Sequence, residues 1–251
     1  MSASDAGPSG AEPSSASRPG PVPPPAGSGR TGPGLLRRLV MLYAGLVLYG
    51  VSEGLQLRAG LGLGPWTVLN QGVARHMGLS IGEAAIGVGA LVLLLWIPLR
   101  QRPGLGTVSN VLVIGLVVDA TLALTPAPGS LWVRVPLLVL AVVLCAVATG
   151  LYISPRFGPG PRDGLMTGLH RRTGRSVRLV RTAIELSVLV TGFALGGSIG
   201  VGTVVFAVGI GPLAQFFLRL FAPAPAGAAG TGQKADAANP VMSDRSVPDP
   251  V

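Results

Sequence analysis

The sequence predicts an all-α membrane protein in which six transmembrane helices form two inverted three-helix repeats, each with a short broken or re-entrant helix. Three observations predict this class. The 251 residues are 49% hydrophobic and only 12% charged, with a mean hydropathy of +0.59, whereas a soluble domain carries about 25% charged residues. Several uncharged apolar stretches reach the roughly 20 residues that cross a bilayer core. The second half of the chain also repeats the glycine, proline and arginine pattern of the first half.

The two ends of the chain differ from the middle. Residues 1–33 and 223–251 are rich in proline, glycine, serine and alanine. Such segments bury too little apolar surface to offset the entropy of ordering, so we expect two disordered tails. The part between them is expected to divide into a first membrane repeat, 34–126, and a second one, 127–222.

Six continuous apolar runs between the tails predict membrane-spanning helices. Because polar and apolar residues do not alternate in them, the runs favour helices over the strands of a barrel. Two further segments, 65–77 and 161–173, are too short and too polar to span alone, and we expect each to be a broken or re-entrant helix. The predicted spans are 37–57, 80–99, 105–125, 132–153, 177–196 and 201–221.

Arginines beside the ends of the spans predict the orientation. Arg37 and Arg38 precede the first span, Arg100 and Arg102 follow the second, and several more lie between the fourth and the fifth. Positive residues concentrate on the cytoplasmic side of membrane proteins, so we expect a multi-pass protein of the plasma membrane with both termini in the cytoplasm. The net charge of +9 then favours membrane lipids as partners. No basic stripe is interleaved with aromatic residues, which argues against nucleic acid.

The internal repeat emerges when the chain is aligned with itself at a spacing of 96 residues, which brings position 64 onto position 160. The letters GPW at 64–66 then align with GPR at 160–162, and PGLGTV at 103–108 aligns with IGVGTV at 199–204. Each copy contains three predicted spans. An odd number of spans makes the second copy enter the membrane in the opposite direction, so the repeats are expected to be inverted.

The two interrupted segments contain the candidate substrate-binding residues, which are Gly160, Arg162 and Asp163 in the second copy and Gly64 and Trp66 in the first. A helix that begins after Gly-Pro presents free amide groups and the positive end of its dipole, which suit an anion. Many transporters build sites near the bilayer midplane from such broken helices. The alternative is a cytoplasmic amphipathic turn whose arginines contact lipid phosphates.

Acidic residues at bilayer depth are further candidates, because an unpaired charge there costs at least about 2.5–3.5 kcal/mol. Glu53 and Asp119 have no basic residue one helical turn away, and we hypothesise that they couple transport to protons or ions, with a structural role as the alternative. Glu185 lies four residues after Arg181 and is expected to form an ion pair with it. Glu83 lies near the end of a span, where it is expected to reach water.

No motif supports an enzyme, since the chain lacks a nucleophile elbow, a Walker loop and an HExxH pair. The single cysteine, Cys145, lies in an apolar run, which excludes an intrachain disulfide and a cysteine-based metal site. We therefore expect no catalytic residue, no cofactor and no metal. Two functions stay open: a transporter that moves a small-molecule substrate, either an anion or a metabolite, between two inverted repeats, and a non-transporting membrane scaffold or accessory partner. The sequence indicates no oligomeric state.

Three stretches, AGLGLGPWTVLNQG, RPGLGTVSN and GLYISPRFGPGPRDGLMTGLHRRTG, resemble the YczE/YitT-like family of bacterial integral membrane proteins. The resemblance covers residues 37–221. It implies a multi-span protein of the inner membrane without an assigned activity. In related members an acid often follows GPW, whereas this sequence has Thr67 at that position.

Overall fold

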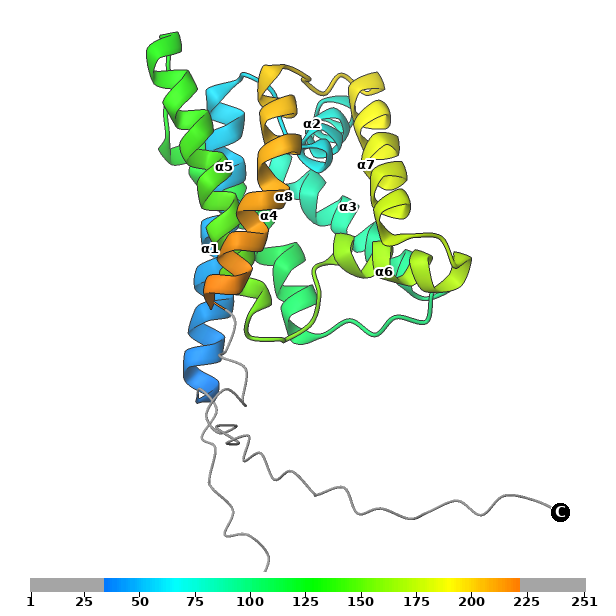
Figure 1. Cartoon of the computed structure of the whole chain (residues 1–251). Coiled ribbons are helices and arrows are strands. Elements are labelled where there is room, and N and C mark those ends of the chain that lie inside the picture. Colours follow the sequence, from blue (N-terminus) through cyan, green and yellow to red (C-terminus); the bar gives the residue numbers. More distant parts are fainter. Residues whose placement is uncertain (1–33, 222–251) are drawn as a thin grey trace, which may run out of the picture. The chain divides into compact units, whose positions relative to one another are not determined.

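The computed structural model describes residues 34–221, and all eight regular elements in this range are α-helices (Figure 1). The two predicted tails lie outside the described residues. The helices are α1 (Leu35–Ala59), α2 (Pro65–Met77), α3 (Ile81–Trp96), α4 (Leu105–Leu124), α5 (Leu131–Ile153), α6 (Pro161–Thr173), α7 (Val177–Ala194) and α8 (Val201–Phe221). The expected all-helical class is therefore confirmed for the described part of the chain, and the bounds of the two short helices agree with the prediction.

Four of these helices, α1, α4, α5 and α8, are long and apolar enough to cross a membrane. A fifth candidate arises if α2 and α3, which meet at an angle of 111°, are counted together as one span. α3 has only 16 residues, or about 24 Å of helix, and the chain leaves the helix just before Pro98. α7 has 18 residues, with charged side chains at 178, 181 and 185. The helices in the regions 80–99 and 177–196 are thus shorter or more polar than a typical span, and six spans stay a prediction.

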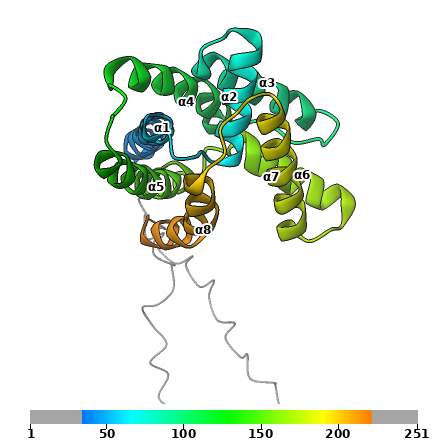
Figure 2. The same cartoon turned by 90° about the horizontal axis from the view of Figure 1, so that it is seen from above.

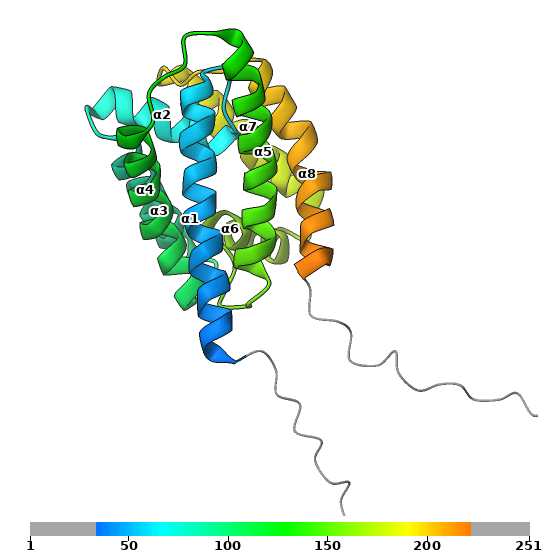
Figure 3. The ribbon, with the colours of Figure 1, turned by 90° about the vertical axis from the view of Figure 1, so that its left-hand side faces the viewer.

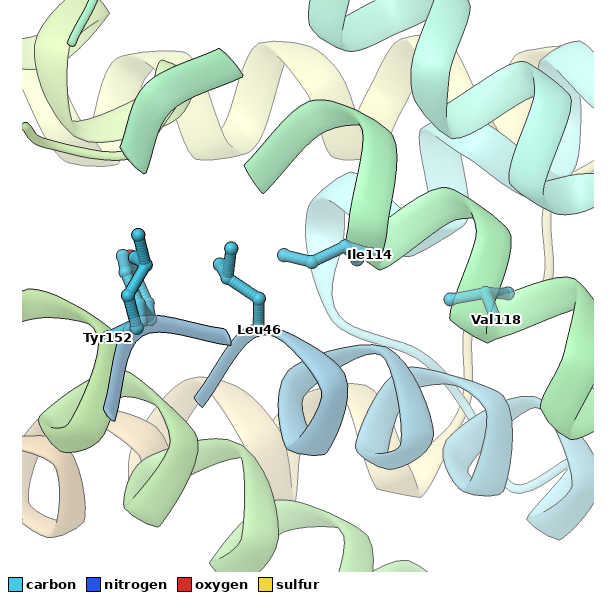
Figure 4. Packing of buried hydrophobic residues seen from close by; sticks show 5 residues of the cluster. Leu46, Ile114, Val118 and Tyr152 are labelled. Atoms are coloured by element: carbon cyan, nitrogen blue, oxygen red, sulfur yellow. The ribbon is translucent and has the colours of Figure 1, made fainter. Parts of the chain in front are cut away.

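The long helices α1 and α5 lie side by side, with α4 against α1 and α8 against α5 (Figures 2 and 3). Small residues permit the close approach, because a Cβ at Gly45 of α1 would lie 2.6 Å from the backbone nitrogen of Tyr152 in α5. Apolar side chains fill the remaining space: Leu46, Ile114, Val118 and Tyr152 belong to one buried cluster contributed by α1, α4 and α5 (Figure 4). The shorter helices form a second group, in which α2 packs on α7 and α3 packs on α6.

Two arginines tie the long helices together in a reciprocal way. Arg38 of α1 donates to the carbonyl oxygen of Pro155, just beyond α5, at 2.7 Å. Arg134 of α5 donates to the carbonyl oxygen of Ala59, at the end of α1, also at 2.7 Å. Arg38 and Arg134 are 96 residues apart, and so are Ala59 and Pro155; this is the spacing that aligns the two halves of the sequence. Each long helix therefore neutralises the carbonyl end of the other, where positive charge is favourable.

The loops before the short helices are held by a second reciprocal pair of contacts. The amide of Gly106, at the start of α4, donates to the carbonyl oxygen of Phe157 at 3.0 Å. The amide of Gly202, at the start of α8, donates to the carbonyl oxygen of Leu61 at 2.7 Å. These residues are again related by the 96-residue spacing. The loop before each short helix is thus held against the start of a long helix of the other half.

The contact between α3 and α6 predicts a substitution that the structure does not tolerate. A Cβ at Gly164 of α6 would lie 2.0 Å from the ring of Trp96, which is buried and donates from Nε1 to the carbonyl oxygen of Pro161 at 3.1 Å. We expect Gly164→Ala to lower the free energy of unfolding by about 1–3 kcal/mol, because overpacking displaces a buried ring. The measurement is thermal unfolding of the purified protein in detergent.

Gly87→Ala is the matched control, because a Cβ at Gly87 of α3 has no atom within 4 Å. Alanine is favoured over glycine inside a helix by up to about 1 kcal/mol, so this variant is expected to be neutral or more stable. Equal melting temperatures for the two variants would contradict the packing of Trp96 on α6.

Candidate functional site

A cavity of about 260 Å³ lies where the first turns of α2 and α6 meet. Its wall is formed by residues 64–67 and 160–163, together with side chains from α1, α4, α5, α7 and α8. All five residues that the sequence suggested for substrate binding contribute to this wall: Gly64, Trp66, Gly160, Arg162 and Asp163. The structure therefore brings together two segments that are separated in the chain by most of one repeat, although their role in binding stays a prediction.

Local sequence explains why both short helices begin at the cavity. Gly64 and Gly160 are the N-cap residues, with nearly identical extended backbone angles (φ −62° and ψ 154°; φ −60° and ψ 158°), and a proline follows each of them. Glycine has no side chain that could accept the first amide hydrogens, and no side chain caps either helix. Both helices end at a glycine in the left-handed region, Gly78 and Gly174, where other residues are disfavoured. The uncapped amides and positive dipole ends of both helices thus lie at the cavity wall.

Arg162 is held by contacts on two sides. Its Nη2 lies 3.3 Å from Oε1 of Glu53 in α1, and its Cζ lies 5.1 Å from the centroid of the Trp66 ring. Trp66 and Arg162 are equivalent positions of the two halves of the sequence, and the fold brings them into contact. The side chain of Glu53 is only 5% exposed and that of Arg162 is 28% exposed. A buried carboxylate is stable only with a partner, so Glu53 and Arg162 balance each other.

Asp163 has a different environment. Its Oδ2 accepts a hydrogen bond from the hydroxyl of Tyr152 at 3.2 Å, and Tyr152 packs edge-on against Tyr49, with ring centroids 6.0 Å apart. Among the described residues, Asp163 forms no ion pair. It also lies in the first turn of α6, where the helix dipole favours a carboxylate. The equivalent position in α2 is Thr67, and the first turn of α2 has no acidic residue. The two helix starts are therefore alike in backbone and different in charge.

Asp119 lies away from this cavity. Its Oδ2 accepts from the hydroxyl of Ser80 at 2.6 Å, and its Oδ1 accepts from the amide of Gly82 at 2.8 Å. Glu83 completes a capping box with Ser80 at the same helix start. The structure thus places Asp119 at the beginning of α3, where a carboxylate is favourable. Of the two acids proposed for ion coupling, only Glu53 contacts a residue of the cavity wall.

The expected ion pair between Arg181 and Glu185 is present, at 2.9 Å. Both side chains also line the cavity, although the sequence suggested only a structural role for them. Their side chains are 52% and 34% exposed, so this pair is more accessible than the pair of Glu53 and Arg162. Sequence reasoning missed other lining residues as well, and polar or aromatic character within apolar spans was the available signal. These residues are Tyr49, Asn110, Thr149, Tyr152 and Gln215.

A smaller cavity of about 30 Å³ adjoins the same region and shares Trp66, Asn110 and Arg162 with the larger one. This volume is sufficient for a water molecule. Nε1 of Trp66 and Oδ1 of Asn70 are buried and have no hydrogen-bond partner among the described residues, and both residues line the small cavity. A donor and an acceptor without partners are costly in a dry interior, so the region around Trp66 is built to contact a polar molecule.

Metal binding has no suitable donor set in the part of the chain that the structure describes. No group of three or more histidine, cysteine, aspartate or glutamate side chains in residues 34–221 could hold a metal ion. Cys145 is buried and free.

The long apolar helices define the chain as a multi-pass helical membrane protein. Residues 36–219 match a family of unknown function, DUF6198, and the chain belongs to this family. An uncharacterized protein of Haemophilus influenzae is 41% identical over 74% of the chain and 85% of its own length. The uncharacterized membrane protein YczE of Bacillus subtilis is 33% identical over 73% of the chain and 86% of its length, as expected from the resemblance to the YczE-like family. The uncharacterized protein YyaS of the same organism is 24% identical over 70% of the chain and 90% of its length. No solved structure is significantly similar to the chain.

The pairing of Glu53 with Arg162 predicts a strong coupling between these two residues. Glu53→Leu leaves the guanidinium group of Arg162 without its counterion. We expect the free energy of unfolding to fall by about 3 kcal/mol, which is the lower end of the range for breaking a buried ion pair. The lower end applies because the side chain of Arg162 is partly hydrated. The double variant Glu53→Leu/Arg162→Met removes both charges and keeps a flexible apolar side chain against Trp66. It is expected to recover at least half of that loss.

The measurement is the unfolding of the wild type, both single variants and the double variant in detergent. If the double variant loses the sum of the two single losses, the two side chains do not interact in the folded protein.

Proposed function

We propose that the chain is a plasma-membrane transporter of small charged solutes, with its binding site between two inverted three-helix repeats. The observation that carries this proposal is the cavity of about 260 Å³. The short helices α2 and α6, which have equivalent positions in the two halves, both begin at this cavity. Transporters with inverted repeats bind their substrates near the bilayer midplane, at the ends of discontinuous helices. Under this proposal the chain crosses the membrane six times, and both termini are cytoplasmic.

The reciprocal contacts support the inverted arrangement. Arg38 with Pro155 and Arg134 with Ala59 exchange the roles of the two halves, as a two-fold axis between the repeats requires. Such an axis in the membrane plane would direct α2 and α6 to opposite faces of the bilayer. Alternating access then follows from the movement of one half against the other around a common site.

Glu53 is the better of the two candidates for coupling. Its carboxylate forms an ion pair with the guanidinium group of Arg162 at 3.3 Å. Protonation of Glu53 would therefore leave the positive charge of Arg162 without its partner at the cavity wall. A substrate with a negative group could then bind to Arg162, and its departure would favour reformation of the pair. Asp119, which caps α3, has no comparable link to the cavity.

The second candidate function is a non-transporting membrane scaffold or accessory partner. Exposed arginines at 171, 172, 175 and 178 favour it, since such a basic stretch suits contact with anionic lipids or an acidic partner. A cavity lined by charged side chains is not needed for that role, so we place transport first. We assign no enzymatic reaction to the chain.

The inverted arrangement makes a prediction about labelling. Met77 and Thr173 are equivalent exposed positions at the ends of α2 and α6. In a background in which Cys145 is replaced by alanine, a membrane-impermeant maleimide added to intact cells is expected to label Met77→Cys and not Thr173→Cys. Thr173→Cys should be labelled only after the membrane is opened. Equal labelling of both positions in intact cells would contradict the inverted repeat.

Transport itself is tested by uptake into proteoliposomes of radiolabelled acetate, inorganic phosphate and glycine. We expect uptake of at least one of them above the level of empty liposomes, and we expect Arg162→Ala to reduce it at least tenfold because the contact between Glu53, Arg162 and Trp66 is lost. Arg102→Ala is the control, since this exposed arginine lies outside the cavity. Normal uptake by Arg162→Ala would remove the cavity from the mechanism, and no uptake of any probe would favour the scaffold.

A further inference from the structure

We propose that the cavity binds a small zwitterion, a molecule that carries one ammonium group and one carboxylate. This inference rests on the proposed function and names its substrate class. It follows from the distribution of charge on the cavity wall, which has a negative part at the start of α6 and a positive part at the start of α2.

The negative part is Asp163. The other two carboxylates of this region have basic partners, because Glu53 pairs with Arg162 at 3.3 Å and Glu185 pairs with Arg181 at 2.9 Å. Asp163 accepts one hydrogen bond from Tyr152 and has no ion pair among the described residues. An ammonium group of a ligand would supply the missing positive charge through a charge-assisted hydrogen bond.

The positive part is the first turn of α2. The amides of Trp66 and Thr67 follow an N-cap glycine and receive no side-chain cap, and no acidic residue lies in this turn. An independent observation points to a polar ligand: Trp66 lines this cavity as well as the smaller one, is only 6% exposed, and its Nε1 has no hydrogen-bond partner in the part of the chain that the structure describes. A carboxylate would accept hydrogen bonds from these donors and would interact favourably with the helix dipole.

A molecule with a single charge fits this wall less well. A simple anion would meet Asp163 without a counterion, while Arg162 is already paired with Glu53. A simple cation would bind Asp163 but would meet the positive end of α2. Both parts are satisfied together only when the ligand itself carries both charges.

The volume limits the size of the ligand. The cavity measures about 260 Å³, which is below the roughly 300–1,000 Å³ of sites for drug-sized molecules. The aromatic side chains of Tyr49, Trp66 and Tyr152 form part of the wall, which leaves space for a short carbon chain. Amino acids with two to four carbon atoms are therefore suitable probes.

The test measures binding to the full-length protein in detergent, without a requirement for transport. The zwitterionic probes are glycine, L-alanine, β-alanine and 4-aminobutanoate. The probes with one charge are acetate, propionate and butyrate, and methyl-, ethyl- and propylammonium. We expect at least one zwitterion to raise the melting temperature by about 2 °C or more, because a ligand of the folded state stabilises it. Its analogues with one charge should cause no shift at the same concentration.

Three variants separate the two parts of the wall, with dissociation constants from isothermal titration calorimetry. Asp163→Asn should weaken binding of the zwitterion at least tenfold. Thr67→Asp adds to α2 the acid that α6 already has, and it should also weaken binding at least tenfold, because two acids would then oppose the carboxylate of the ligand. Thr67→Asn has the same size without the charge and should weaken binding less than Thr67→Asp. If Asp163→Asn does not fold, the two variants of Thr67 still decide the outcome.

Several results would overturn the inference: no shift with any zwitterion, an equal shift with an analogue that has one charge, or equal affinities for Thr67→Asp and Thr67→Asn. These results are distinct from a failure of the proposed function. Uptake of acetate or phosphate without binding of a zwitterion would retain a transporter with another substrate class. Binding of a zwitterion without uptake of any probe would retain the site and reject transport.

Discussion

Backbone amides at the starts of α2 and α6 impose the constraint on which the rest of the structure depends. A helix that begins inside an apolar assembly leaves its first amides without intrahelical acceptors, and glycine at the N-cap provides no side chain to satisfy them. Proline at the next position removes one of these donors, but the following amides still need a polar environment. A cavity with charged walls at this point supplies it. The cavity therefore lies where these two helix starts need polar surroundings.

Reciprocal contacts between the halves keep these helix starts in place. Each loop that precedes a short helix is bound to a long helix of the other half, through the amides of Gly106 and Gly202. The ends of α1 and α5 are likewise bound by the arginines of the partner helix. Neither half can form these contacts alone, so the placement of both helix starts depends on both halves of the chain.

Divergence between the two halves then gives the site its polarity. A symmetric pair of helix starts would present equal charge on both sides, whereas this chain has Asp163 in α6 and Thr67 in α2. The same divergence places Arg162 opposite Trp66, where the guanidinium group lies on the indole ring at 5.1 Å. The two helix starts thus share one backbone geometry, and the residues that differ between them set the charges on the cavity wall.

Glycine, proline and apolar runs were sufficient to predict the helical class and the bounds of the short helices. The four-residue spacing of opposite charges was sufficient to predict the pair of Arg181 with Glu185. These features depend on residues within one or two helical turns. Only the tertiary structure decided which acid meets Arg162. Glu53 and Asp119 look alike in sequence, yet one pairs with a residue 109 positions away and the other caps α3. Such pairing depends on how distant helices pack, and a periodic apolar pattern specifies that a face is buried without specifying which residue it will contact.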